Sequence, residues 1–284
     1  MGGIIWLASY PKSGNTWLRV FLANLQRDGQ EPVKINELDR SPIASDRRLF
    51  DKLTGLEASD LSPEEIDRLR PEVYERLAGE AKEPLFVKVH DAYTYGADGR
   101  PLLSATDSRA IYLIRNPLDV AVSFAHHLGQ DLDTIIDNMA DAEYALAAAS
   151  GKLHGQLRQR LLSWSRHVLS WLAAPLPVLV LRYEDIMQQP LKTFSQAARF
   201  AGLPDEPARV RQAVAFSDFK ELQRQEQERG FRERPPKAEK FFREGGCGTW
   251  RRELTLAQAA RLILAHREVM QRFGYLTAEG EPAF

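Results

Sequence analysis

The stretch Ile4-Ile5-Trp6-Leu7-Ala8-Ser9-Tyr10-Pro11-Lys12-Ser13-Gly14-Asn15-Thr16-Trp17 decides the fold of this chain. Residues 4–8 form a short apolar run without helical periodicity, which is typical of a buried parallel strand. From Trp17 to Leu25, apolar residues recur at helical spacing. The turn between these segments therefore lies between the carboxyl end of a strand and the start of a helix, where backbone N–H groups and the helix dipole favour an anion.

This turn differs from the nucleotide-binding P-loop, in which four residues separate two glycines and the second glycine precedes Lys and Ser or Thr. Here Lys12 precedes Gly14, which is the only glycine of the turn. The sequence therefore predicts a shorter cradle for a phosphate or sulfate, with its cation on the entry side; an ordinary exposed turn is the alternative. The indole of Trp17 is either one wall of a base-binding slot or a core residue.

The composition indicates a soluble globular protein, with 284 residues, 44% of them hydrophobic and 27% charged, and we expect one domain over residues 1–284. A formal net charge of -1 gives no general attraction for nucleic acid or an anionic membrane. The single cysteine, Cys247, excludes an intrachain disulfide and a cysteine-cluster metal site. The first strand leaves no room for a signal peptide, and no apolar run approaches the roughly 20 residues of a membrane helix, so we expect a cytoplasmic protein.

Strands and helices alternate along the chain. Ser62 and Asn116 are candidate N-caps, each followed by proline at the first helical position. The strongly charged residues 223–240 contain Pro235-Pro236 and predict an exposed, mobile loop. This alternation predicts an α/β fold with a parallel central sheet flanked by helices. The expected strands are residues 4–8, 85–90, 109–114 and 177–181, and the expected helical segments include residues 132–174, 191–201 and 256–273.

Basic side chains follow each expected strand. Lys12 follows the first strand, Lys88 and His90 end the second, Arg115 follows the third and Arg182 the fourth. Because the carboxyl ends of parallel strands form the ligand-binding edge of such a sheet, we expect these side chains to lie near one another. Clustered cations are costly unless an anionic ligand lies among them, so the sequence predicts a ligand with several negative groups.

Three segments of the chain resemble motifs of the sulfotransferases that use 3′-phosphoadenosine 5′-phosphosulfate (PAPS). Residues 10–17 resemble the 5′-phosphosulfate loop, residues 114–123 the 3′-phosphate motif, and residues 241–250 the C-terminal phosphate-binding loop. The motifs occur in the family's order and span nearly the whole chain. The resemblance implies a P-loop-NTPase-like sulfotransferase fold, PAPS as donor and 3′-phosphoadenosine 5′-phosphate (PAP) as product, with no metal.

The same resemblance implies roles for particular residues. Within the 3′-phosphate motif, Arg115 and Ser123 would bind the 3′-phosphate. Tyr183 matches a tyrosine near adenine, and Ser217 matches a hydroxyl residue two positions before a phenylalanine. The implied donor-binding residues are Lys12, Ser13, Gly14, Asn15, Thr16, Trp17, Arg115, Ser123, Tyr183, Ser217, Phe241, Phe242, Arg243, Glu244 and Gly245.

Three residues are candidates for catalysis. His90 matches the histidine of the family's Lys-Thr-His segment, which implies the general base, and imidazole titrates near neutral pH as a base must. Lys88 would assist at the transferring sulfuryl group. Lys12 and the loop amides suit neutralisation of the departing phosphate.

The chain departs from the family at a few positions. Asp91 follows His90 where cytosolic members have leucine, and it either orients the imidazole or competes as base. Glu244 stands where lysine is common, and Thr249 stands where aspartate precedes Trp250. The side chains of Tyr93, Tyr95, Phe124, His126 and His127 are candidate walls of an acceptor pocket.

We predict a sulfotransferase that moves a sulfuryl group to a hydroxyl or amine of a small-molecule acceptor, with no nucleic-acid partner and no membrane span. A nucleotide-dependent kinase is the alternative enzyme, supported only by the strand-turn-helix cradle. A catalytically silent nucleotide-binding or scaffold protein is the third possibility. The presence of both candidate catalytic residues, His90 and Lys88, is evidence against it.

Overall fold

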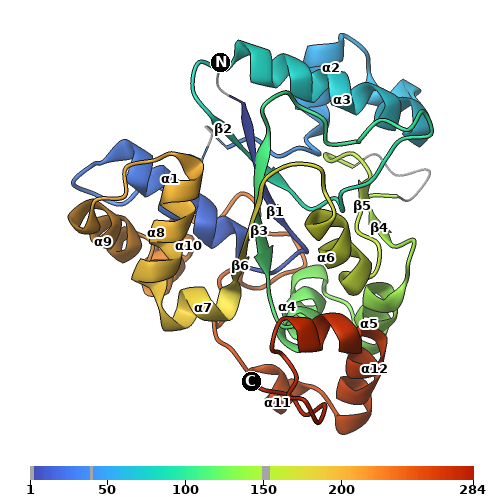
Figure 1. Cartoon of the computed structure of the whole chain (residues 1–284), viewed down its shortest axis with the longest axis vertical. Coiled ribbons are helices and arrows are strands. Elements are labelled where there is room, and N and C mark those ends of the chain that lie inside the picture. The colour runs from blue at the N-terminus through green and yellow to red at the C-terminus, as the bar shows by residue number, and fades with distance from the viewer. Residues whose placement is uncertain (1–2, 39–40, 149–153) are drawn as a thin grey trace. The chain divides into compact units, whose positions relative to one another are not determined.

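The computed structural model describes residues 3–38, 41–148 and 154–284, and these residues include a four-stranded sheet. Its strand order is β2-β1-β3-β6 (Figure 1), with the bounds β1 Ile4–Ser9, β2 Leu85–Val89, β3 Arg109–Ile114 and β6 Val178–Arg182. β1 and β2 pair in parallel, from Ile4 opposite Leu85 to Ala8 opposite Val89. Every residue of β1 is buried, as its unbroken apolar run predicts for an inner strand. The expected strands are confirmed.

The chain divides into two compact units. Unit 1 comprises Met1–Tyr10, Arg40–Tyr112 and Ala142–Val180, and unit 2 comprises Pro11–Asp39, Leu113–Asp141 and Leu181–Phe284. The α/β class with a parallel central sheet is confirmed. The extent of one domain over residues 1–284 stays a prediction.

Unit 1 contains the helix that starts at the predicted cap. The Ser62 hydroxyl accepts from the Glu65 N–H, and the Glu65 carboxylate accepts from the Ser62 N–H at 2.8 Å, which forms a capping box. Trp6 of β1 packs edge-on against Tyr74 of this helix, with 5.0 Å between ring centroids. The elements of unit 1 besides the sheet are α2 (Arg47–Thr54), η1 (Ala58–Asp60), α3 (Pro63–Glu80), the paired β4 (Ala145–Leu146) and β5 (Gln159–Arg160), and α6 (Trp164–Leu172).

Unit 2 is mostly helical. Its helices are α1 (Asn15–Arg27), α4 (Pro117–Leu128), α5 (Leu132–Ala140), α7 (Tyr183–Gln188), α8 (Pro190–Ala201), α9 (Pro207–Phe216), α10 (Phe219–Arg229), α11 (Trp250–Glu253) and α12 (Leu256–Arg272). Asn116 caps α4 by accepting from the Leu118 N–H at 3.1 Å, as predicted. The helices expected at 191–201 and 256–273 are confirmed. Between α5 and α6 the expected helix-rich span contains the β4–β5 pair, and residues 149–153 of that span lie outside the described residues.

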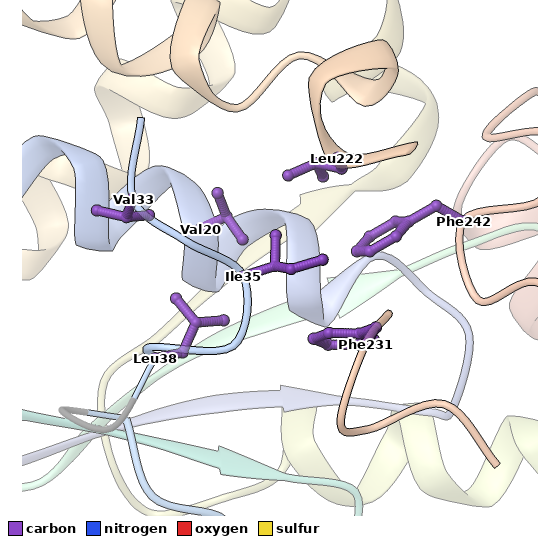
Figure 2. Close-up of a cluster of buried hydrophobic side chains, with 7 residues drawn as sticks. All are labelled: Val20, Val33, Ile35, Leu38, Leu222, Phe231 and Phe242. Carbon is purple, nitrogen blue, oxygen red and sulfur yellow. The ribbon is translucent and has the colours of Figure 1, made fainter. Parts of the chain in front are cut away.

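The loop prediction for residues 223–240 is wrong at its beginning, because α10 extends to Arg229. Arg224 forms ion pairs with Glu221 and Glu228, one helical turn away in each direction, so the high charge stabilises a helix. Leu222 of α10 lies in a buried apolar cluster with Val20, Val33, Ile35, Leu38, Phe231 and Phe242 (Figure 2). Among the described helices, none is long and apolar enough to cross a membrane.

Candidate active site

The turn after β1 has the backbone of an anion cradle. Two residues adopt positive φ angles, Lys12 at 68° and Gly14 at 97°. A Cβ atom on Gly14 would lie 2.8 Å from the Tyr183 ring, so glycine satisfies both the φ angle and the close approach. The first amides of α1 lack intrahelical partners by the geometry of any helix start. The buried Ser13 hydroxyl also has no hydrogen-bond partner among the described residues, so the turn suits an anion with several oxygens.

Arg115, directly after β3, joins three of the predicted donor-binding segments within unit 2. Its guanidinium donates to the Lys12 carbonyl and to the Gly246 carbonyl, each at 2.9 Å. It also lies over the ring of Tyr183, 4.3 Å from the ring centroid. Through these three contacts, the buried Arg115 links the first loop, the C-terminal loop and Tyr183.

Trp17 belongs to a packed aromatic group. Its indole N–H donates to the Ser217 carbonyl at 2.8 Å, and its ring lies edge-on to Tyr183 and Phe194. The Ser217 hydroxyl is fully buried, donates to a helical carbonyl of α9 and accepts from Asn24 at 3.1 Å. Ser217 thus holds Trp17 through its backbone carbonyl, while its hydroxyl faces the core.

Lys12 extends to the C-terminal loop. Its ammonium lies 4.0 Å from the centroid of the Phe241 ring and 3.4 Å from Nδ1 of His127. The His127 ring lies edge-on to Phe241 at 5.6 Å. His127, expected among the acceptor walls, therefore lies beside the predicted phosphate-binding cation.

Residues 241–250 are fixed at both ends. The amides of Phe241 and Phe242 donate to the carboxylate of Glu226 on α10. At the other end, the buried Asp119 accepts from the Gly248 and Trp250 amides at 2.8 and 3.0 Å and from the Thr249 hydroxyl at 2.9 Å. The last bond gives a structural role to the threonine that replaces the family's aspartate. Gly245 lies between these anchors with φ 64°, and a Cβ there would lie 2.6 Å from the ring of Phe219, a contact between distant residues that no local sequence pattern indicates.

The charged side chains of this loop are paired with one another and with α11. Arg243 pairs with Glu253 at 2.8 Å and with Glu244 at 3.5 Å. Arg252 pairs with Glu244 at 2.6 Å, so the negative charge of Glu244, at the position where lysine is common, is neutralised by a neighbouring arginine. His126, expected as an acceptor wall, instead contacts Glu253 at 2.6 Å.

Two other predicted residues, Ser123 and Phe124, belong to α4. Ser123 is half-buried, and within the described residues no hydrogen bond joins it to Arg115. Phe124, expected as an acceptor wall, is fully buried in the core.

His90, in unit 1, follows β2 and is held by the end of β1. Its Nδ1 lies 2.8 Å from the carbonyl oxygen of Ser9 and 3.3 Å from the Ser9 hydroxyl. Donation from Nδ1–H to the carbonyl makes Nε2 the nitrogen that accepts a proton. Lys88, two residues earlier on β2, is buried. Its backbone N–H donates to the Pro42 carbonyl, and its carbonyl accepts from the Ala44 N–H.

The backbone of His90 is held by a second histidine. His167 Nε2 lies 3.0 Å from the His90 carbonyl oxygen, and its Nδ1 lies 2.9 Å from the Tyr112 hydroxyl. Complete burial lowers the pKa of His167 to about 4, so the ring is neutral at physiological pH. Its Nε2–H then donates to His90, and its Nδ1 accepts from Tyr112.

Asp91 has neither of the two roles that the sequence left open. Its carboxylate binds the guanidinium of Arg70 in a fully buried pair, at 2.8 and 3.1 Å, and accepts from the Arg160 amide at 3.0 Å. Its carbonyl accepts from the Trp171 indole at 3.0 Å. Asp91 therefore anchors the segment that follows His90.

Two tyrosines continue this segment. Tyr93 packs edge-on against Tyr95 at 6.0 Å and lies 5.5 Å from Trp171 between ring centroids. Tyr93 is buried and Tyr95 is half-exposed. Among residues 3–38, 41–148 and 154–284, no group of three or more His, Cys, Asp or Glu side chains is arranged to hold a metal ion.

The chain matches the sulfotransferase domain model over residues 4–274. Sulfotransferase 1A1 of Canis lupus familiaris is 26% identical over 282 residues, covering 94% of this chain and 83% of the relative. Flavonol 3-sulfotransferase of Flaveria bidentis is 23% identical, covering 88% and 76%.

Solved structures show the same fold. Mouse sulfotransferase SULT7A1 complexed with PAP aligns with a TM-score of 0.59 and 19% identity, covering 98% of this chain and 87% of that one. Retinol dehydratase in a complex with retinol and PAP aligns with a TM-score of 0.60 and 19% identity, covering 94% and 81%. The predicted sulfotransferase fold is confirmed. The chain therefore belongs to the sulfotransferase domain family, and the prediction of a PAPS-dependent sulfotransferase is confirmed at the level of the family.

Proposed function

We propose that this enzyme transfers a sulfuryl group from PAPS to a hydroxyl or amine of a small molecule, with His90 as the general base. The observation that carries the role of His90 is the 2.8 Å contact between its Nδ1 and the Ser9 carbonyl. This bond selects the tautomer in which Nε2 carries the lone pair. His167 binds the carbonyl of His90, and Arg70 binds the carboxylate of the next residue, Asp91. Both contacts restrain the backbone that carries the His90 ring.

On the donor side, we assign the phosphate contacts to residues of unit 2. The Lys12 ammonium and the amides at the start of α1 would neutralise charge on the departing 5′-phosphate. Arg115, Ser123 and Arg243 would bind the 3′-phosphate. The buried Ser13 hydroxyl supplies a further donor for a phosphate oxygen. Among these residues, Arg243 must exchange its ion pair with Glu253 for the phosphate.

PAPS supplies a sulfuryl group attached to a phosphate leaving group. As the acceptor attacks sulfur, its proton passes to Nε2 of His90 and a new bond to sulfur forms. The bond from sulfur to the phosphate oxygen breaks, and its electron pair remains on the phosphate, where Lys12 stabilises the charge. We assign Lys88 to the oxygens of the transferring group.

We propose an acceptor with an apolar or aromatic body. Tyr93 and Tyr95 support this assignment, since they follow His90 in the chain and Tyr95 exposes half of its surface. Retinol dehydratase is solved with retinol and with androsterone, which are the small molecules named for those complexes. The cytoplasmic location and the absence of a nucleic-acid partner stay predictions.

The test compares wild-type enzyme with His90→Ala, using radiolabelled PAPS and a panel of phenols and alcohols. We expect kcat to fall by roughly 10²- to 10⁴-fold, the usual contribution of a general base, while PAP affinity measured by calorimetry stays within a few-fold. His154→Gln, which changes another histidine of unit 1, is the control. Full activity in His90→Ala would remove the assigned role, and tighter binding of magnesium-ATP than of PAP would indicate the kinase instead.

A further inference from the structure

A buried carboxylate on α10 binds the start of the C-terminal loop. Glu226 is 6% exposed, and its Oε1 and Oε2 accept from the amides of Phe241 and Phe242 at 2.8 and 2.9 Å. Consecutive backbone amides of this kind commonly chelate an anion. Here the anion is a side chain of the enzyme itself, so these two amides are not the ones that meet a phosphate.

Gln223 completes the attachment from the same face of α10. Its side-chain amide donates to the carbonyls of Phe242 and Arg243 at 3.0 and 2.9 Å. Residues three apart on a helix lie side by side, so Glu226 and Gln223 together bind both the N–H and the C=O groups of one short backbone segment. The Phe242 ring packs in the same apolar cluster as Leu222 of α10 (Figure 2).

This backbone segment carries the predicted donor contacts. Phe241 places its ring against the Lys12 ammonium, Arg243 is a predicted phosphate ligand, and the Gly246 carbonyl accepts from Arg115. A change in the backbone at 241–243 would therefore move Phe241 and Arg243 together, and with Phe241 the ring that contacts the Lys12 ammonium.

We propose that Glu226 and Gln223 are positioning residues for donor binding, which hold residues 241–243 in the donor-binding conformation before PAPS arrives. The inference rests on the proposed function. A loop that is already ordered binds more tightly because its ordering entropy is not lost on binding. Removal of the attachment should thus weaken binding of the donor and leave the chemical step unchanged once the donor is bound.

The test uses Glu226→Gln, which keeps the size of the side chain but turns an N–H donor toward one of the two backbone amides. We expect the Kd for PAP and the KM for PAPS to rise by roughly tenfold to a hundredfold, the loss of a hydrogen bond to a charged group. The value of kcat at saturating PAPS should stay within about twofold. Hydrogen exchange at the amides of Phe241 and Phe242 should accelerate in the variant.

Glu228→Gln is the matched control, because Glu228 lies on the same helix with an exposed partner, Arg224. It should leave the KM for PAPS unchanged. Gln223→Ala, which removes the side-chain donor to the Phe242 and Arg243 carbonyls but leaves no buried charge without a partner, gives a second measurement if Glu226→Gln does not fold, and it should also raise the KM for PAPS.

Wild-type PAP affinity in both Glu226→Gln and Gln223→Ala would overturn the inference, as would a fall in kcat with an unchanged KM in these two variants. Failure of the proposed function would look different, because the wild-type protein itself would then bind no PAP and transfer no sulfuryl group, and the inference would fall with it.

Discussion

Replacing the buried His167 with glutamine should make the protein less sensitive to acid. In the folded protein, burial lowers the pKa of His167 to about 4 from an ordinary value of 6.5. The unfolded chain therefore binds a proton below pH 6.5 that the folded chain does not bind until about pH 4. Stability from this group is fully present above pH 6.5 and is lost as the pH falls toward 4.

The size of this effect follows from the two pKa values. Integration between them gives a loss of about 2 kcal/mol at pH 5 relative to pH 7.5, rising to about 3 kcal/mol below pH 4. His167→Gln does not titrate, and its side-chain N–H can still donate to the His90 carbonyl. The variant should therefore lose about 2 kcal/mol less than wild type between pH 7.5 and pH 5.

The assay is urea unfolding of both proteins at the two pH values, with the free energy of unfolding as the measured quantity. His266 is also buried, with its pKa lowered to about 4, but it is present in both proteins and cancels in the comparison. Equal losses of free energy in wild type and variant would refute the reasoning, because His167 would then titrate alike in the folded and unfolded states.

Two further substitutions test packing around the predicted site. Gly14→Ala should lower PAP affinity at least roughly tenfold by calorimetry, because its Cβ would lie 2.8 Å from Tyr183; Gly55→Ala, also at positive φ but with open space around it, should leave PAP affinity unchanged. Asp91→Asn should cost about 3 kcal/mol of unfolding free energy in urea, because it removes the carboxylate charge 2.8 Å from the buried Arg70 and leaves only Asp67, 3.9 Å from the guanidinium. Asp98→Asn, which breaks an exposed pair with Arg100, should leave unfolding nearly unchanged, and an equal loss in both variants would contradict the burial argument.

Local signals predicted most of the fold. The apolar run before Lys12, the Ser62 capping box and the Asn116-Pro117 helix start each depend on residues a few positions apart, and each occurs as expected. The wrong loop prediction at α10 has a local reason too: a high density of charge favours an exposed loop by composition, but these charges are spaced three and four residues apart and form ion pairs along a helix.

The sequence patterns do not predict hydrogen bonds between residues that are distant along the chain. Glu226 binds amides 15 and 16 residues further along the chain, and Asp91 binds an arginine 21 residues before it. Periodicity and capping preferences describe neighbours on one element, whereas these bonds depend on how elements pack. The sequence therefore left two roles open for Asp91, and the structure assigns it a third.

By itself, the sequence determined the strand-turn-helix around Lys12, the order of the three motifs and hence the family, because these features depend on residue type and spacing along the chain. Only the tertiary structure decided which group each polar atom binds. The Ser9 carbonyl binds Nδ1 of His90, Arg70 binds the Asp91 carboxylate, and two backbone amides bind the Glu226 carboxylate. Buried polar groups must find partners, and packing determines which partner is within reach.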